Sequence, residues 1–214
     1  MFVYFVKILV SFLVIINPVQ VVPVYLELTS NDTIDEQRKI AIKATVLAAM
    51  ILFFFAILGD WLITQLEIST TALLVAGGIL LFIFALQRVL GGGGTTADEK
   101  LEAQHKRDVA VFPLAVPMIA GPGALTVVMF QVKQAEGDIL SQVILFFALS
   151  LVLLTNGVML YHANRVGRAL GVTGTNVVTR VFGIILAAIA IQLILNGITD
   201  FLKVQRAMSA IGLV

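Results

Sequence analysis

Residues 8–26, ILVSFLVIINPVQVVPVYL, form an apolar stretch with an asparagine and a proline at its centre. A membrane-spanning helix needs about 20 mostly apolar residues, and this stretch has that length. Asn17 lies ten residues after Lys7 and ten residues before Glu27, which places it near the middle of the hydrocarbon layer. The stretch therefore predicts a membrane span whose helix is interrupted at mid-depth.

The composition of the whole chain agrees with insertion into a lipid bilayer. Of its 214 residues, 59% are hydrophobic and 13% are charged, whereas charged residues make up about a quarter of a typical soluble domain. The formal net charge of +1 argues against a nucleic-acid partner, because such proteins carry a strongly basic surface. The absence of cysteine excludes disulfides and thiolate metal sites.

Six apolar stretches predict an all-α integral membrane protein with six transmembrane helices. They cover residues 8–26, 42–63, 70–90, 109–132, 139–162 and 177–202. The tract 91–108 begins with four glycines and continues with mixed charges, which is typical of a flexible linker. The predicted organisation is a three-span repeat at 1–90, a linker at 91–108 and a second three-span repeat at 109–214.

Lysine and arginine are distributed unequally between the two ends of the predicted spans. Ten of them lie at the first, third and fifth connections and four lie at the opposite end. Positively charged residues accumulate on the cytoplasmic side of membrane proteins. We therefore expect a multi-pass protein of the cell membrane, with the linker in the cytoplasm and both termini outside.

The third and sixth predicted spans are related by an internal repeat. A shift of 105 residues aligns 70–92 with 175–197, and eight of the 23 positions are identical. The pairs Gly78/Gly183 and Gln87/Gln192 are more specific than matches among Leu, Ile and Ala. Because each half contains three spans, the second half enters the membrane from the opposite face, as in alternating-access transporters. The alternative is a duplicated membrane protein without transport activity.

A second interruption is predicted in the fourth span, because a shift of 104 residues aligns Asn17-Pro18 with Gly121-Pro122. Neither proline has an N–H, so neither can bond the carbonyl four residues earlier. Asn17 suits the N-cap position, where its side-chain oxygen would accept from backbone N–H groups, and Pro18 suits the first helical position. The glycines beside Pro122 would allow a sharp turn and close approach of another molecule. Spans one and four are therefore predicted to be discontinuous.

The two half-helix N-termini predict a site for an anionic group, because each presents unpaired N–H groups and a partial positive charge. Carbonyls released by the prolines can accept from an ammonium group, so a small zwitterion fits the polarity of the site. The predicted substrate-binding residues are Asn17, Pro18, Gln20, Gly121, Pro122, Gly123, Ala124, Thr126 and Asn156.

Some of these polar residues have a second, structural interpretation. Thr126 either lines the pocket or bonds a nearby carbonyl and stabilises the kink. Asn156 has only an apolar counterpart in the first half, and an asymmetric substrate could use it. Outside this set, Gln192, Asn196 and Thr199 lie on one face of the last span and favour hydrogen bonds between helices over contact with the substrate.

No enzymatic activity and no cofactor are predicted. The sequence contains no nucleotide-binding loop, no metal-ligand cluster and no Ser-His-Asp set at one depth. No ionisable residue lies near the middle of a predicted span, which leaves Na⁺ or H⁺ as the alternatives for a coupling ion.

Two motifs resemble those of the MarC family of integral membrane proteins. They are NPVQVVPVYLELT at 17–29 and FPLAVPMIAGPGA at 112–124, and the resemblance extends over essentially the whole chain. The first motif of the family often has glycine and phenylalanine where this chain has Gln20 and Tyr25. The resemblance implies six spans and, because some members are described as such transporters, transport of small neutral amino acids such as glycine and alanine.

The combined prediction is a secondary transporter of small neutral amino acids that works by alternating access, with the substrate carboxylate bound at the half-helix N-termini. One alternative is a passive channel for small polar solutes. Another is a non-transporting membrane protein associated with drug resistance, which the origin of the family name suggests. The sequence defines neither the transport direction nor the oligomeric state.

Overall fold

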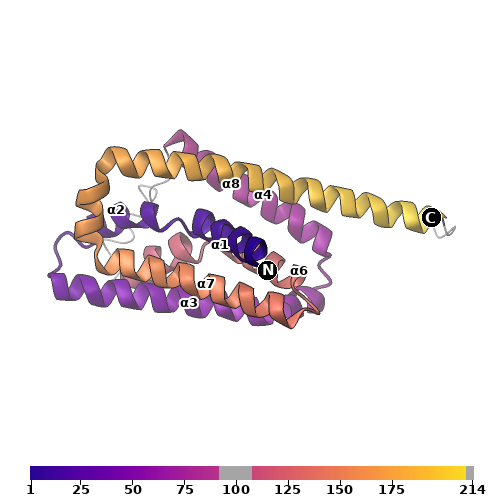
Figure 1. Cartoon of the computed structure of the whole chain (residues 1–214), viewed down its shortest axis with the longest axis horizontal. Coiled ribbons are helices and arrows are strands. Elements are labelled where there is room, and N and C mark those ends of the chain that lie inside the picture. The colour runs from indigo at the N-terminus through magenta and orange to yellow at the C-terminus, as the bar shows by residue number, and fades with distance from the viewer. Residues whose placement is uncertain (92–107, 211–214) are drawn as a thin grey trace.

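The computed structural model describes residues 1–91 and 108–210, which form a bundle of helices (Figure 1). In chain order the helices are α1 (Phe2–Ile16), α2 (Pro18–Leu28), α3 (Ile34–Gln65), α4 (Thr70–Leu90), η1 (Ala110–Ile119), α6 (Pro122–Gln134), α7 (Ile139–Tyr161) and α8 (Ala163–Ala210). No strand occurs in the described part of the chain, which confirms the all-α class. Most of the predicted linker, residues 92–107, lies outside the described residues.

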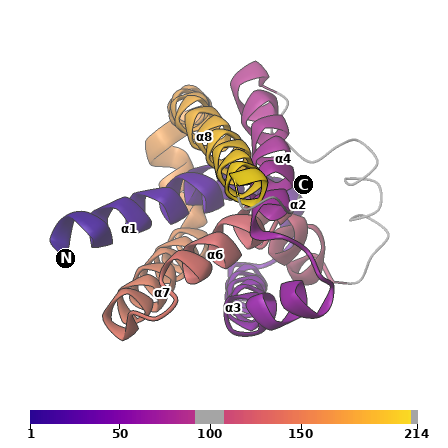
Figure 2. The same cartoon turned by 90° about the vertical axis from the view of Figure 1, so that its right-hand side faces the viewer.

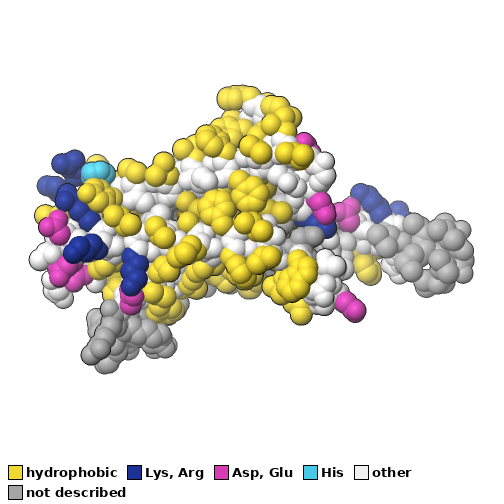
Figure 3. Space-filling model, turned by 90° about the horizontal axis from the view of Figure 1, so that it is seen from below, with side chains coloured by type: hydrophobic (Ala, Val, Ile, Leu, Met, Phe, Trp, Pro, Cys, Tyr) yellow, Lys and Arg dark blue, Asp and Glu magenta, His cyan; other side chains and the backbone are white. Residues whose placement is uncertain are grey.

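Five helical stretches are long and apolar enough to cross a membrane, and there are six if η1 and α6 together form one bent span. The first stretch combines α1 and α2 over the 27 residues Phe2–Leu28. On the face shown in Figure 3, hydrophobic side chains cover the middle of the molecule and charged side chains gather toward its two ends. An apolar belt between charged ends is the surface that a lipid bilayer requires.

Several helices begin where local capping chemistry favours a start. Before α3, the Thr33 hydroxyl accepts from the N–H of Glu36, and the Glu36 carboxylate accepts from the N–H of Thr33 at 2.9 Å. Before α4, the Ser69 hydroxyl accepts from a backbone N–H at 3.1 Å. Before α7, the Asp138 carboxylate accepts from the N–H of Leu140 at 3.1 Å. Each side chain satisfies an N–H that the helix itself leaves unpaired.

The first helix interruption is a single residue, Asn17, with φ 46° and ψ 70°. This left-handed conformation ends α1, and α2 begins at the next residue, Pro18. Asparagine adopts this conformation more readily than most residues. The predicted capping bond is wrong, because the side chain of Asn17 accepts from no backbone N–H. In place of the capping bond, the side-chain amide of Asn17 donates to the side-chain oxygen of Gln20.

The second interruption is longer and more sharply bent. η1 is a π-helix that contains Pro113 and Pro117 and has non-helical backbone angles at Phe112 and Val116. It ends at Ile119, α6 begins at Pro122, and the two axes differ by 53°. The prolines account for the irregular geometry, because each removes a backbone N–H from the helix.

The last helix begins earlier than the sequence predicts. The apolar stretch starts at residue 177, whereas α8 starts at Ala163. Its backbone is interrupted at Gly171, where φ is 60° and ψ is 179°, a conformation that is accessible essentially only to glycine. As Figure 1 shows, the part of α8 before this residue lies across one end of the bundle, and the longer part runs back along α4.

One end of the bundle is formed by the loop between α2 and α3 and by the junction of α7 and α8 (Figure 1). There the side-chain amide of Asn164 donates to the side-chain oxygen of Gln37 at 2.9 Å. We call this end the arginine-rich end, because it carries Arg38, Arg165 and Arg168.

Helices α4 and α8 lie side by side and antiparallel (Figures 1 and 2). A Cβ placed on Gly78 of α4 would lie 2.9 Å from the carbonyl oxygen of Ala190. A Cβ placed on Gly183 of α8 would lie 3.3 Å from the carbonyl oxygen of Ala85. The shift of 105 residues aligns Gly78 with Gly183 and Ala85 with Ala190. The contact is therefore reciprocal, since aligned residues exchange roles across the helix pair.

Among the described residues, Gln192 and Asn196 bond to each other and not, as the sequence predicts, to other helices. The side-chain amide of Gln192 donates to the side-chain oxygen of Asn196 at 2.8 Å, within α8 itself. Gln192 is exposed on the surface of the bundle. The spacing of four residues explains this outcome, because it lets two side chains on one helix reach each other.

Candidate functional site

The first interruption leaves the last carbonyls of α1 without their normal helical partners, and Arg88 of α4 bonds to two of them. Nη1 of Arg88 donates to the carbonyl oxygen of Val14 at 2.9 Å. Nη2 donates to the carbonyl oxygen of Ile15, also at 2.9 Å. Val14 is the residue whose carbonyl loses its helical bond at Pro18, because proline has no N–H. A guanidinium thus caps the negative end of the α1 dipole.

The second interruption presents the N-terminus of α6. Gly121 occupies the N-cap position with an extended backbone, φ −77° and ψ 169°, and no side chain caps the helix. The first intrahelical bond runs from the N–H of Leu125 to the carbonyl of Gly121 at 3.0 Å. The N–H groups of Gly123 and Ala124 lie in the first turn, where the helix offers them no carbonyl. This end of α6 therefore suits an anionic group.

Gly121 is required by its own chain. A Cβ at this position would lie 2.3 Å from the carbonyl oxygen of Pro117, a distance that no side chain tolerates. This contact explains the glycine by itself, and the expectation that glycine here allows another molecule to approach stays a prediction.

A small cavity lies where the two interruptions meet, and we call it the central cavity. Its volume is about 40 Å³, and it is lined by Ile15 of α1, Arg88 of α4, and Gly121, Gly123 and Ala124 at the start of α6. A water molecule takes up about 30 Å³ in the liquid. The central cavity in this conformation therefore holds about one water molecule and is too small for an amino acid.

A second cavity of about 260 Å³ adjoins the central cavity, and we call it the intermediate cavity. Arg88 lines both of them. The intermediate cavity is also lined by Gln20 of α2 and by Thr179 and Arg180 of α8. Its volume is sufficient for a small amino acid, and its polar lining comes from both sequence halves.

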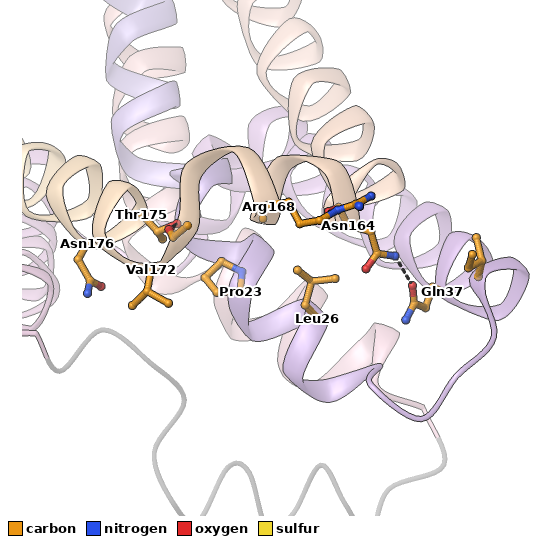
Figure 4. Close-up of a pocket in the computed structure, with 11 residues that line it drawn as sticks. Pro23, Leu26, Gln37, Asn164, Arg168, Val172, Thr175 and Asn176 are labelled. Carbon is orange, nitrogen blue, oxygen red and sulfur yellow. Dashed lines mark hydrogen bonds between the residues drawn. The ribbon is translucent and has the colours of Figure 1, made fainter.

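A groove of about 790 Å³ continues from the intermediate cavity to the arginine-rich end, and we call it the end groove. The two share Pro23, Thr175 and Asn176 as lining residues. Figure 4 shows α2 on one side of the groove, with Pro23 and Leu26, and α8 on the other side. Because neighbouring spaces share lining residues, we describe the three together as a series between the arginine-rich end and the helix interruptions.

The lining of this series is positively charged. Arg88, Arg168 and Arg180 line it, and no Asp or Glu among the described residues does so. A cleft with one sign of charge attracts groups of the opposite sign. The series therefore favours molecules that carry a carboxylate or another anionic group.

A family model described as "MarC family integral membrane protein" matches residues 2–202. The chain belongs to the MarC family. It is 40% identical over 207 residues to a "UPF0056 membrane protein" of Aquifex aeolicus, covering 94% of this chain and 95% of that protein. It is 33% identical over 200 residues to "UPF0056 membrane protein YhcE" of Escherichia coli, covering 92% of each. No solved structure matches.

Membership in this family confirms the resemblance found in the sequence. It also confirms that the protein is a multi-pass integral membrane protein. The first MarC motif, 17–29, contains the interruption at Asn17 and all of α2, and the second, 112–124, runs through η1 into α6. The names of these two relatives describe them as membrane proteins and specify no substrate or activity. The motifs of the family thus coincide with the two interruptions. The function is therefore argued from the chemistry of the residues at these interruptions.

The structure brings only part of the predicted site to the central cavity. Gly121, Gly123 and Ala124 line it, together with the C-terminal end of α1. The N-terminus of α2 does not line it, since Pro18 is buried and absent from its lining and Gln20 lines the intermediate cavity. The cavity is therefore built from one helix N-terminus and one helix C-terminus, where the sequence predicts two N-termini.

Asn17 and Asn156 are both completely buried. Nδ2 of Asn17 donates to Oε1 of Gln20 at 3.2 Å, and Oδ1 of Asn17 has no partner in the described part of the chain. Both polar atoms of the Asn156 side chain on α7, Nδ2 and Oδ1, likewise have no hydrogen-bond partner in the described part of the chain. Neither residue lines the central cavity.

Thr126 has the structural role that the sequence left open. Its hydroxyl donates to the carbonyl oxygen of Pro122 at 2.9 Å, within the first turn of α6. Its methyl group packs against α4, because a Cβ on Gly77 would lie 1.8 Å from it. Thr126 therefore fixes the start of α6 against α4 and does not line the central cavity.

Arg88 is the residue that sequence reasoning missed in this member of the MarC family. The sequence places it at the end of the third span, among the residues of a connection. In the structure its side chain is partly buried and reaches the interruption in another helix. The available signals were its place in the last turn of an apolar helix and the unpaired carbonyl that Pro18 creates.

Proposed function

We propose that the protein is a secondary transporter of small neutral amino acids. The observation that carries this proposal is the central cavity, where a partly buried guanidinium, the N-terminus of α6 and the carbonyl end of α1 converge. The first two groups suit a carboxylate, and the third suits an ammonium group. A small zwitterion is the ligand with both charges, and only small side chains would fit beside Ile15 and Leu186.

We also propose that the chain consists of two inverted-topology repeats, 1–90 and 109–214, with discontinuous first and fourth spans. The reciprocal contact between α4 and α8 supports this, because a two-fold axis in the membrane plane would exchange Gly78 with Gly183 and Ala85 with Ala190. The matched positions of Pro18 and Pro122 at helix starts support it as well. Repeats of this kind suit alternating access, in which one half moves against the other around a fixed site.

In the proposed transport cycle, this conformation is the state in which the central cavity is closed and the end groove is open at the arginine-rich end. The positive-inside rule makes that end cytoplasmic and places both termini outside the cell membrane. Substrate would move through the end groove and the intermediate cavity, and the central cavity would widen to receive it. No enzymatic step and no cofactor are part of the proposal, and Na⁺ or H⁺ would supply the coupling.

Transport by the purified protein in proteoliposomes tests the proposal. We expect saturable uptake of labelled glycine or alanine that unlabelled amino acid on the opposite side accelerates. Such counterflow distinguishes a carrier from a passive channel. A broad amino-acid panel, measured under Na⁺ and pH gradients, identifies the coupling ion. No saturable uptake of any member of the panel would contradict the proposal and favour a non-transporting membrane protein.

A matched pair of alanine variants ties the transport activity to the central cavity. Ala124 lines this cavity, so Ala124→Val should fill it and raise the KM for glycine. Ala169 is exposed on the first part of α8, and Ala169→Val is the control. Equal KM values for the two variants would remove the central cavity from the substrate site.

A further inference from the structure

We propose that Arg88 exchanges its two backbone partners for the substrate carboxylate, and that the carbonyls of Val14 and Ile15 then receive the substrate ammonium group. This inference rests on the proposed function and deepens it, because it defines the substrate class. In the conformation described here the guanidinium and the two carbonyls bond to each other. A zwitterion inserted between them would satisfy both sides at once.

The present partners of Arg88 are neutral. Both bonds end on backbone carbonyl oxygens, and no described Asp or Glu side chain forms an ion pair with this guanidinium. Hydrogen bonds between two charged groups are stronger than bonds to a neutral acceptor, and a carboxylate can accept two parallel N–H bonds from arginine. A carboxylate that reaches Arg88 is therefore a better partner than the carbonyls it replaces.

The carbonyl of Val14 has no helical partner to return to after the exchange. Pro18 stands where the helix would supply an N–H, so this oxygen must find another donor. A buried carbonyl without a donor is unfavourable, especially in a membrane. The ammonium group of the substrate supplies N–H donors at the place where the guanidinium leaves. The same proline that creates the interruption thereby makes the site selective for a molecule with a donor.

The location of Arg88 links this exchange to access. Its side chain lines both the central and the intermediate cavity, so it stands at the boundary between them. A carboxylate arriving through the intermediate cavity meets the guanidinium first. Release of Val14 and Ile15 would then free the end of α1 from α4, which widens the central cavity. Substrate binding and opening of the site become one event.

The inference predicts that substrates need both a free carboxylate and a free ammonium group. In wild-type proteoliposomes that take up labelled alanine, we expect glycine to compete at least about tenfold more strongly than glycinamide, which lacks the carboxylate, or glycolate, which lacks the ammonium group. Equal competition by either analogue would overturn the exchange. Wild-type protein without saturable uptake would overturn the proposed function and this inference together.

The variants Arg88→Gln and Arg88→Lys test the residue itself, with Arg165→Gln as the control. Arg165 is an exposed arginine of the arginine-rich end that lines neither the central nor the intermediate cavity. Arg88→Gln should raise the KM for alanine by about tenfold or more and should bring competition by glycine and glycinamide close to equality. Arg88→Lys keeps the charge but loses the planar pair of donors, so its KM should lie between those of Arg88→Gln and wild type.

Discrimination between glycine and glycinamide separates this role from a purely structural one. If Arg88 only stabilises the end of α1, its variants lose thermal stability or yield but keep the wild-type preference for glycine. That result would overturn the inference while leaving the proposed transport function in place. If Arg88→Gln does not fold, the analogue competition on wild-type protein and the Arg88→Lys variant decide between the two roles.

Discussion

The two interruptions solve the same problem with different chemistry. At Asn17 the chain breaks for a single residue, and a guanidinium from another helix satisfies the carbonyls that α1 leaves free. At Gly121 the chain bends by 53°, and the packing partner is the nearby carbonyl of Pro117 in the same segment. The first interruption thus depends on tertiary structure, whereas the second depends on local backbone geometry.

This difference separates a part of the site that can change partners from a part that cannot. The bonds of Arg88 join two helices and can be exchanged without altering either backbone. The contact between Gly121 and Pro117 is a backbone contact, so it changes only if the whole segment refolds. In the proposed transport cycle, the first interruption would supply movement and the second a fixed binding surface.

The largest effect on stability is expected from Arg88→Met, which keeps much of the length of the side chain but removes its donors. The carbonyls of Val14 and Ile15 would be left unpaired, and the loss is about 3 kcal/mol for two bonds to a charged group, before any gain from removing a buried charge. Thermal unfolding in detergent measures it. A melting temperature equal to that of wild type would show that the first interruption does not depend on Arg88.

Gly121→Ala should destabilise the second interruption by about 2 kcal/mol, because the new methyl group meets a backbone oxygen that cannot rotate away. The matched control is Gly174→Ala in α8, where the nearest atoms to a Cβ belong to Leu170 and lie 3.7 Å or more away. The same unfolding measurement compares the two. If the two variants have the same melting temperature, the close approach of Pro117 does not determine the conformation of this segment.

The reciprocal contact between α4 and α8 allows a finer comparison of the two halves. A Cβ on Gly78 would lie 2.6 Å from Ile194 Cγ1, whereas the nearest atom to a Cβ on Gly183 is Val89 Cγ2 at 2.9 Å. We expect Gly78→Ala to cost about 1 to 2 kcal/mol and Gly183→Ala to cost less. Unfolding of both variants and of the double variant measures the two contacts and their coupling. The opposite order would contradict the packing described for this helix pair.

The smallest expected effect on stability is at the start of α7. This helix has a side-chain cap, whereas α6 has none. A hydrogen bond from the Ser141 hydroxyl, helped by the backbone N–H groups of Leu140 and Ser141, holds the pKa of Asp138 below its usual range. A lowered pKa in the folded state contributes stability that is present above the usual carboxyl pKa and is lost as the pH falls through the lowered value. We therefore expect a small decrease in melting temperature on acidification, and Asp138→Asn should remove this component. An unchanged pH profile in that variant would exclude Asp138 as its source.

The sequence predicts the local features of this molecule better than its tertiary ones. Pro18 and Pro122 mark the starts of α2 and α6, because a missing N–H acts on the residues next to it. The capping bond predicted for Asn17 is wrong, because the left-handed backbone turns its side chain toward Gln20. Arg88 could not be assigned, because its partners lie 73 and 74 residues away in the chain. They come together only in the folded bundle, where α1 and α4 both pack against α6 and α8.

The close approach of α4 and α8 also bears on how such a chain can arise. In each helix a glycine precedes an alanine by seven residues, and each glycine meets the alanine of the other helix. A helix with this surface is complementary to an identical helix turned end for end. A half-length ancestor inserted in both orientations would already possess this contact, so joining two copies into one polypeptide would require no new interface.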